Sequence, residues 1–302
     1  MKKMKGILSL VAALVLVAMG YLNMEDITEI FLSENASENI SIEETVAAGE
    51  MKVWFLDVGQ GDCTIIQTNE GCMMVDAGNN EWGNEVTAFL EEQGIEKLDY
   101  LILTHPDADH IGGADDVLET VEVDKVLMPE VENDTMTYEE VVNDIEQFGI
   151  EVIYPEVEET YGLGDAEFTI LCPDASLISK DDLNGSSVGI KLVHGKNSFV
   201  LCGDAEEKSE LTMAEYFGES LACDVLKCGH HGSSTATTDE FLQMTDPTWA
   251  VISCGEGNSY GHPHAEVLSK LEDADVQILR TDKQGTVEAT SDGDNIYWTS
   301  DR

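Results

Sequence analysis

The amino-acid sequence predicts an α/β fold in which two β-sheets pack face to face and helices cover both outer sides. Short runs rich in β-branched and aromatic residues alternate with amphipathic stretches from residue 51 to the end of the chain. Both halves of this region contain several such runs with helices between them, which favours two sheets. A chain of 302 residues is long enough to bury a core of this size.

In the first half of this region, turns that contain glycine separate three consecutive strands. A stretch with helical spacing follows, places Val86, Phe89 and Leu90 on one face and ends at Gly94. An apolar strand and an exposed helix come next. The expected strands are 52–57, 63–67, 72–75 and 100–103, and the expected helices are 84–93 and 135–147.

The second half contains a predicted hairpin whose register bears on the functional residues. If its two strands pair around Gly195, then Ser187 lies opposite Asp204. His194 lies beside the turn, several residues from Asp204, and we expect it to be a solvent-exposed turn residue. The expected strands are 168–171, 188–193, 198–201, 225–226, 250–253, 276–280 and 286–289, and the expected helices are 206–216 and 263–271.

The N-terminal segment has the pattern of an export signal. Three lysines precede an apolar stretch at 7–19, and Ala18 and Gly20 suit a cleavage site. The stretch is shorter than the roughly 20 apolar residues of a membrane span, but an uncleaved anchor stays open. We expect a signal peptide or anchor at 1–23, an acidic linker at 24–50 with eight acids and no Lys or Arg, and a folded domain at 51–302. The protein would then be extracytoplasmic, either secreted or anchored through its N-terminal segment.

The seven cysteines lack paired spacing and mostly lie in apolar runs. We therefore expect buried free thiols that pack as small apolar side chains. This expectation conflicts with export, because exported proteins ordinarily pair their cysteines.

The charge balance restricts the partners. The sequence contains 61 acidic residues against 15 Lys and Arg, which gives a formal net charge of −46. Such a surface repels a polyanion. Nucleic acid is therefore possible as a partner but disfavoured, and a small or cationic substrate fits better. The lysines that could follow a nucleic-acid backbone across the central part of the domain are Lys180, Lys191, Lys196, Lys208 and Lys227.

The strongest chemical signal is the segment THPDADHIGG at 104–113. It follows an apolar strand and contains four potential metal ligands within six residues. Imidazole and carboxylate groups suit a divalent cation such as zinc or manganese. Alternate residues of an extended segment point the same way, so His105 and Asp107 would face one ion. Asp109 and His110 would turn towards a second ion.

Together with five further motifs, this segment resembles the metallo-β-lactamase superfamily. Within that superfamily, the sequence is similar to the branch that includes the hydrolase domain of the competence channel ComEC and the teichoic-acid phosphorylcholine esterases. The six motifs span about residues 51–282, nearly the whole domain. They are FLDVGQGD at 55–62, VDAG at 75–78, HPDADH at 105–110, LCGD at 201–204, GHHGS at 229–233 and YGHP at 260–263.

The resemblance implies an αββα sandwich that holds two divalent metal ions, zinc or manganese. The implied metal ligands are His105 and Asp107 for the first ion, Asp109 and His110 for the second, Asp204 as a bridge, and His230 or His231. Asp62, Asp76 and Ser187 would lie behind the ligands. Asp109, His231 and His262 would take catalytic roles.

The adjacent histidines leave an alternative open. Adjacent residues on a strand point in opposite directions, so we expect only one of His230 and His231 to be a direct ligand and favour His231. The other would contact the substrate phosphate. His262 would face the substrate from a rigid loop, and His264 would lie at the surface or behind the ligands.

Two departures from the family pattern concern the first ion. Asp107 stands where the family has His, which adds negative charge and makes manganese a competitor of zinc. Ser187 occupies the position of another expected ligand, so the first ion would lack a protein ligand and bind more weakly or with water.

These observations predict an exported metal-dependent hydrolase. The interpretation that fits best is a phosphodiesterase or phosphoesterase that uses a metal-bridged hydroxide and acts on a small-molecule or envelope-linked phosphoester. A ComEC-like DNase, another hydrolase of the same fold and a non-catalytic binding protein stay open as alternatives. The resemblance fixes a fold more firmly than a substrate.

Overall fold

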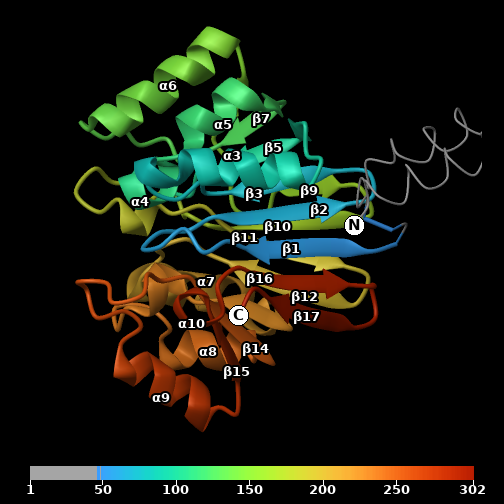
Figure 1. Ribbon diagram of the computed structural model, residues 1–302. Coiled ribbons are helices and arrows are strands. Elements are labelled where there is room, and N and C mark those ends of the chain that lie inside the picture. Colours follow the sequence, from blue (N-terminus) through green and yellow to red (C-terminus); the bar gives the residue numbers. More distant parts are fainter. Residues whose placement is uncertain (1–45, 48) are drawn as a thin grey trace, which may run out of the picture. The chain divides into compact units, whose positions relative to one another are not determined.

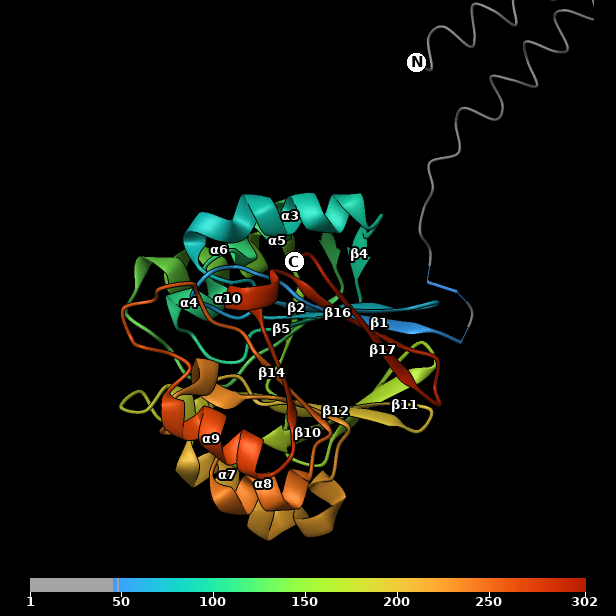
Figure 2. The ribbon, with the colours of Figure 1, turned by 60° about the horizontal axis from the view of Figure 1, so that its bottom comes forward.

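Two large β-sheets form the centre of the protein in the computed structural model, which describes residues 46, 47 and 49–302 (Figure 1). One sheet has eight strands and the other has seven. Helices cover the outer face of each sheet (Figure 2). The predicted αββα sandwich is therefore confirmed. The predicted signal segment at 1–23 and nearly all of the predicted linker lie outside the described residues.

The eight-stranded sheet is antiparallel at one side and parallel at the other. Strands β3, β5, β7 and β8 run parallel, and helices α3, α5 and α6 pack on the outer face through a shared apolar cluster. In sheet order the strands are β17 (Ile296–Ser300), β16 (Val287–Ser291), β1 (Met51–Phe55), β2 (Thr64–Thr68), β3 (Cys72–Val75), β5 (Tyr100–Ile102), β7 (Lys125–Leu127) and β8 (Glu151–Ile153). The helices are α3 (Gly83–Glu92), α4 (Ala108–Ile111), α5 (Ala114–Thr120) and α6 (Met136–Phe148), and β4 (Lys97–Leu98) pairs with β6 (Glu122–Val123) beside them.

The seven-stranded sheet has the same mixed character. Strands β12 to β15 run parallel, and helices α7, α8 and α9 cover the outer face through a second apolar cluster. In sheet order the strands are β15 (Gln277–Arg280), β14 (Trp249–Ile252), β13 (Val225–Lys227), β12 (Asn197–Leu201), β11 (Gly189–His194), β10 (Ala166–Cys172) and β9 (Thr160–Leu163). The helices are α7 (Glu207–Phe217), α8 (Asp239–Thr245), α9 (Ala265–Asp273) and α10 (Thr281–Gln284).

The inner faces of the two sheets meet in a third apolar cluster. Phe55, Phe168 and Phe199 are fully buried there. Burying a large apolar side chain stabilises a fold by about 1.5–3 kcal/mol, so this layer fixes the two sheets against each other. The loops at one edge of the sandwich are thereby held at a defined separation.

The predicted hairpin of β11 and β12 is confirmed, with His194 opposite Asn197 and Ile190 opposite Leu201. The prediction that His194 is exposed is wrong. Its side chain is buried, and its Nδ1 lies 2.8 Å from the Ser291 hydroxyl of β16. The end of the β16–β17 hairpin packs over the turn and covers the imidazole.

Other expectations concern the cysteines and the shortest elements. All seven cysteines are buried and free, as predicted. Helix α8 and several short strands, among them β7 and β17, were not predicted, because their apolar patterns are too brief to stand out. Within the described part of the chain, no helix has the length and apolar character needed to cross a membrane.

Candidate metal centre

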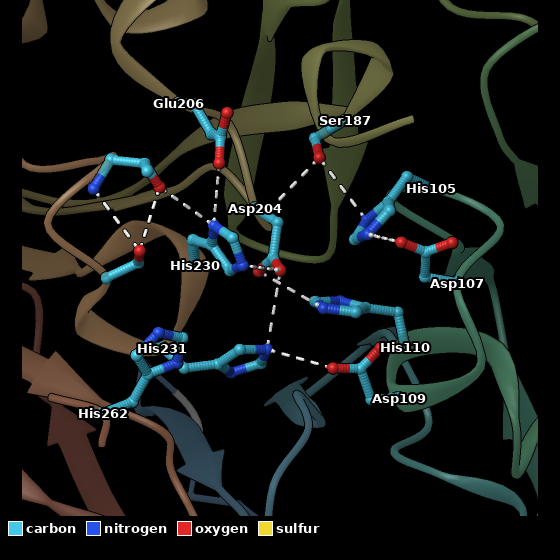
Figure 3. Close-up of polar contacts among 12 residues, drawn as sticks. His105, Asp107, Asp109, His110, Ser187, Asp204, Glu206, His230, His231 and His262 are labelled. Carbon is cyan, nitrogen blue, oxygen red and sulfur yellow. Dashed lines mark hydrogen bonds and ion pairs between the residues drawn. The ribbon is translucent and has the colours of Figure 1, made fainter. Parts of the chain in front are cut away.

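The predicted ligands lie together at one edge of the sandwich, in loops that follow strands of both sheets (Figure 3). The eight-stranded sheet contributes the loops after β3 and β5, and the seven-stranded sheet contributes the loops after β12, β13 and β14. Neither sheet could form the site alone. The loops hold Asp76, His105–His110, Asp204, His230–His231 and His262.

His110 is oriented by a buried carboxylate. Its Nδ1 donates a hydrogen bond to Asp76 Oδ2 at 2.7 Å, and Asp76 also accepts from the Thr104 amide and hydroxyl, each at 2.8 Å. A carboxylate can only accept in this pair, so the proton lies on Nδ1. The Nε2 atom of His110 consequently points to Asp204 Oδ1, 3.2 Å away.

His105 and His231 are oriented in the same way as His110, with Nδ1 towards the protein and Nε2 towards the centre of the site. The Thr104 hydroxyl donates to Asp76 and so accepts from His105 Nδ1 at 3.1 Å. His231 Nδ1 donates to the carbonyl oxygen of Ser253 at 3.1 Å. Each ring therefore keeps its Nδ1 hydrogen-bonded to the protein and presents Nε2 to the centre of the site, which is the usual arrangement of a metal-binding histidine.

Several polar atoms at this point are buried and have no hydrogen-bond partner. Such orphaned groups cost about 1–3 kcal/mol each, and native proteins seldom retain one without a ligand or ion. They are His105 Nε2, His110 Nε2, His231 Nε2, Asp62 Oδ1 and Asp204 Oδ1. Asp62 Oδ1 lies on the Nδ1 side of His231. Bound divalent cations would satisfy the other four atoms, so the donor set fits the metal ions that the fold implies.

The possible ligand atoms form overlapping groups in which all atoms lie within 4.8 Å of one another. One group is His105, His110 and Asp204, and another is Asp109, His110 and His231. Asp204 faces both, because its Oδ1 lies 3.2 Å from His110 and its Oδ2 lies 3.5 Å from His231. This carboxylate has the position expected of a bridging ligand.

Two of the predicted ligands lie at the margin of the site. Asp107 is 38% exposed, and its Oδ2 lies 3.5 Å from His105 Nε2. His230 has its Nδ1 3.0 Å from Glu206 Oε1, while its Nε2 lies 3.6 Å from Asp204. Neither residue belongs to the groups of convergent ligand atoms within the described chain.

The prediction that His230 and His231 point in opposite directions because they lie on a strand is wrong. The pair does not lie on a strand, because β13 ends at Lys227 and both residues have left-handed backbone conformations, with φ of 48° and 54°. Two consecutive left-handed residues other than glycine cost about 1–3 kcal/mol each and cluster at functional sites. The turn directs the His231 ring into the site and the His230 ring towards Glu206.

Ser187 supports the site from behind. Its hydroxyl accepts from the Asp204 amide at 3.2 Å and lies 3.4 Å from His105 Nδ1, the nitrogen that faces away from the centre. The hydroxyl therefore links the backbone of one ligand to the ring of another. It does not converge on Nε2 in place of the expected imidazole.

Lys227 has a structural role that the sequence did not predict. This residue was expected among the lysines available to nucleic acid, but it is buried, and its Nζ lies 2.7 Å from Asp62 Oδ2. Asp62 in turn lies 3.5 Å from His231 Nδ1, and its amide donates to the Asp109 carbonyl oxygen. Asp62 and Lys227 lie in the motifs DVGQGD and KCGHHGS, so the presence of both motifs is the sequence feature that could have indicated this ion pair.

The glycine that precedes Asp62 explains how its loop approaches the metal loop. A Cβ at Gly61 would lie 2.5 Å from the Asp109 carbonyl oxygen. Any side chain there would push the loop away and break the hydrogen bond from the Asp62 amide. The predicted position of Asp62 behind the ligands thus has a direct steric basis.

In the metal-free site, the positive charge of protonated histidines offsets the negative charge of the carboxylates, and a bound cation would take over this role. Burial alone would lower the pKa of His231, but Asp204 and Asp62 outweigh burial and raise it to about 10. Asp204 and Asp76 likewise raise the pKa of His110 well above its usual value, against the effect of burial. The pKa of Asp204 is held well below its ordinary range by His231 and His110, although burial opposes this. Protons thus occupy the metal-free site.

His262 differs from the metal-facing histidines. Burial and the neighbouring His231 and His230 lower its pKa to about 4. Its ring stacks on Tyr260, with centroids 5.6 Å apart, and lies 6.2 Å from the ring of His231. His262 is therefore a neutral imidazole at the mouth of the site. His264 lies behind it and accepts from the Ser234 amide at 2.9 Å.

The geometry agrees with the comparison with known families. A family model described as metallo-beta-lactamase superfamily matches residues 56–256, which is more than half of the chain. The chain belongs to the metallo-β-lactamase superfamily.

The curated relatives are competence proteins and related proteins. ComE operon protein 3 of Bacillus subtilis (strain 168) is 32% identical over 259 residues, which cover 80% of this chain and 33% of the relative. Recombination protein 2 of Haemophilus influenzae is 33% identical over 221 residues, 72% of this chain and 26% of the relative. Competence protein ComA of Neisseria gonorrhoeae is 28% identical over 81% of this chain and 33% of its own length. The chain thus spans about a third or less of these relatives.

Solved structures share the fold. Igni18, a novel metallo hydrolase from Ignicoccus hospitalis KIN4/I, superposes with a TM-score of 0.52 at 16% identity and covers 79% of this chain and 98% of its own. The metallo-beta-lactamase fold protein YhfI from Bacillus subtilis gives 0.51 at 14% identity, over 79% and 99% of the two chains. The protein is therefore a metallo-β-lactamase superfamily hydrolase with a potential metal site, similar to ComEC-like proteins.

Replacing the carboxylate behind His110 tests the orientation of that ligand. We expect Asp76→Asn to weaken metal binding about 10–100-fold, the usual effect of losing a partner that orients a ligand. Competition with a chromogenic chelator measures the affinity. Asp273→Asn, an exposed change of the same kind on α9, serves as the control and should bind as the wild type does. Equal affinities for all three proteins would contradict the assigned role.

Removing the buried cation tests the Lys227–Asp62 pair. Lys227→Met leaves the Asp62 carboxylate buried without its partner, so we expect a loss of about 3–5 kcal/mol in the free energy of unfolding. Urea unfolding of the metal-free protein measures the change. The double variant Asp62→Asn, Lys227→Met removes both charges and should recover most of the loss. A double variant as unstable as the single one would show that the ion pair is not the cause.

The raised pKa of His231 predicts a pH dependence. Its folded pKa of about 10 exceeds the ordinary value of 6.5, so its contribution to stability is complete below about pH 6.5 and is lost as the pH rises towards 10. We expect the free energy of unfolding of the metal-free protein to fall across this range, with a shallower fall in His231→Gln. Metal affinity should rise over the same range, because the proton competes with the ion. Parallel stability profiles for the two proteins would refute this assignment.

Proposed function

We propose that this chain is an exported phosphoesterase that binds two divalent ions, zinc or manganese, and cleaves a phosphodiester. The observation that carries the proposal is the convergence of three buried Nε2 atoms and a two-sided carboxylate at one point between the sheets. Export rests on the charge and apolar pattern of residues 1–23. The substrate would be a small or envelope-linked phosphoester.

The chemistry of the side chains supports hydrolysis by water. No Walker lysine motif occurs in the sequence. Two segments match GxSxG, GSSVG at 185–189 and GNSYG at 257–261, but neither forms a nucleophile elbow, because the first leads into strand β11 and the second lies within the long loop between β14 and α9. The cysteines are buried, and burial raises the pKa of Cys63, which lies next to the site. A buried thiol with a raised pKa is a poor nucleophile. A reaction with a covalent intermediate on the protein is therefore disfavoured.

The residues have separable tasks in this reaction. Two divalent ions, when bound, would lower the pKa of a water molecule and neutralise the charge of the phosphoryl group. His105, His110 and His231 would hold the ions through Nε2, and Asp204 would face both. Asp76 and Ser253 keep the rings in place through Nδ1. His262 would interact with the phosphoryl oxygens or the leaving group from the mouth of the site.

Asp107 and Asp109 set the charge of the mouth. Asp109 is partly exposed, and its Oδ2 lies 3.3 Å from His231 Nε2. Asp107 adds a second carboxylate on the side of His105. This negative rim suits a substrate with a single phosphate charge or a cationic group better than one with several phosphates.

DNA is the second candidate substrate, because relatives carry the names recombination protein and competence protein. Most of the lysines considered for a nucleic-acid path are engaged elsewhere. Lys180 pairs with Glu132, Lys196 pairs with Asp294, and Lys191 donates to two backbone carbonyl oxygens. A short end or single strand could still enter the site, and an assay with DNA separates the two substrates.

The test uses the full chain, stripped of metal and reconstituted with Zn²⁺ or Mn²⁺. We expect hydrolysis of bis-(p-nitrophenyl) phosphate and of a nitrophenyl phosphorylcholine to exceed that of p-nitrophenyl phosphate. Activity should disappear on chelation and return with the metal. Asp204→Asn should lower kcat/KM at least about 100-fold, because it removes the shared ligand.

Two results would overturn the proposal. The first is phosphodiester turnover that persists after metal removal. The second is turnover of only a β-lactam or thioester substrate by the reconstituted protein. Degradation of linear single- or double-stranded DNA in the absence of small-diester turnover would favour the DNase.

A further inference from the structure

His262 lies in the loop that follows β14. Asn258, a residue of the same loop, holds the loop in shape through hydrogen bonds to its backbone. The Asn258 side chain donates to the His262 carbonyl oxygen at 2.6 Å and accepts from the His262 amide at 3.0 Å. It also accepts from the Tyr260 amide at 3.1 Å. Both backbone groups of His262 are thus fixed by one side chain.

A second contact comes from a distant loop of the other sheet. Gln60 lies between β1 and β2, in the motif that also holds Asp62. Its Oε1 accepts from the Gly255 amide at 3.2 Å, and its Nε2 lies 3.5 Å from His262 Nδ1. The two loops can approach because residue 255 is glycine, where a Cβ would lie 2.8 Å from the Gln60 amide nitrogen.

This pair of contacts determines where the proton of His262 lies. The Gly255 amide can only donate, so it fixes the oxygen of the Gln60 carboxamide. The NH₂ group of Gln60 is then turned to His262 Nδ1 and can only donate as well. Nδ1 must accept, and the proton of the neutral imidazole lies on Nε2.

His262 therefore has the opposite tautomer to the metal-facing histidines. His105, His110 and His231 use Nδ1 as the donor to the protein and leave Nε2 to a metal ion, which would displace the proton held there in the metal-free protein. His262 presents an N–H at Nε2, and no described residue accepts from that atom. The hydrogen-bond partner of Nδ1 therefore decides whether a histidine at this site can bind a metal ion through Nε2 or donate a hydrogen bond from it.

We propose that Gln60 is a positioning residue that holds His262 as the Nε2–H tautomer, so that His262 donates a hydrogen bond to a phosphoryl oxygen of the substrate. The contact with substrate rests on the proposed phosphoesterase function, whereas the tautomer of His262 is independent of that function. A donor that is already oriented stabilises charge that develops on the phosphoryl oxygens without further reorganisation. A neutral His262 also avoids placing another positive charge beside the metal ions.

The tautomer can be observed directly. Two-bond ¹H–¹⁵N correlation spectra of the ¹⁵N-labelled full chain, metal-free and zinc-loaded, distinguish Nδ1–H, Nε2–H and imidazolium rings. Comparison with His262→Gln assigns the signals. We expect the Nε2–H pattern for His262 at neutral pH in the wild type. A wild-type His262 with the proton on Nδ1 overturns the proposal without reference to activity.

Variants of Gln60 supply the causal test. Gln60→Glu replaces the donor by a carboxylate that can only accept, so His262 should shift to Nδ1–H or to the imidazolium. Gln60→Met, which keeps the length and removes the donor, should give a mixture of tautomers. Gln147→Glu, the same change on an exposed position of α6, should leave the His262 signals as in the wild type. Unchanged His262 signals in both Gln60 variants overturn the proposal.

Kinetics then separate positioning from metal binding. With zinc content equal to that of the wild type, Gln60→Glu should lower kcat by about 10–100-fold towards a diester, with a smaller change in KM. His262→Gln should fall by about 10²–10³-fold, the range for loss of one oriented donor. If no diester is cleaved by any of the proteins, the proposed function fails while the tautomer result stands. If the wild type is active and Gln60→Glu matches it, the positioning role fails.

Discussion

The structure depends on a set of buried polar atoms that face one another without hydrogen bonds. The Nε2 atoms of His105, His110 and His231 and the carboxylate of Asp204 point at one small volume. Burying them unpaired is costly, and the protein adds to that cost with two consecutive left-handed residues in the turn that presents His231. Bound metal ions would offset both costs, and this requirement explains the buried carboxylates, threonine and lysine that surround the ligands.

The sandwich makes this convergence possible. The loop with His105 and His110 belongs to the eight-stranded sheet, and those with Asp204 and His231 belong to the seven-stranded sheet. The apolar layer between the sheets sets their separation, and the Lys227–Asp62 ion pair links the two sides directly beneath the site. Loops on a rigid scaffold can keep functional groups in place while their sequences vary. Metal binding and the packing of the two sheets are thus parts of one problem.

The sequence was sufficient to predict the sandwich, the β11–β12 hairpin and the ligand-rich segment at 105–110, because each is a contiguous pattern. It was insufficient where distant segments decide the outcome. His194 is buried by a hairpin about a hundred residues away, and Lys227 looked like a surface lysine because its partner Asp62 lies 165 residues earlier. The turn at His230 and His231 could not be predicted either, since left-handed histidines oppose the local preference of the backbone. Tertiary contacts also fix the tautomers, which no sequence pattern records.

We propose that two cations bind between these loops and share Asp204. Anomalous diffraction from crystals of the zinc- or manganese-loaded protein, recorded on both sides of the metal absorption edge, can locate them. We expect two peaks, one on either side of Asp204 and each within about 2.0–2.3 Å of ligand atoms. One should contact His105 and the other His231. Fully loaded crystals with no peak at this point, or with a peak held only by residues elsewhere, would show that these loops do not form the metal centre.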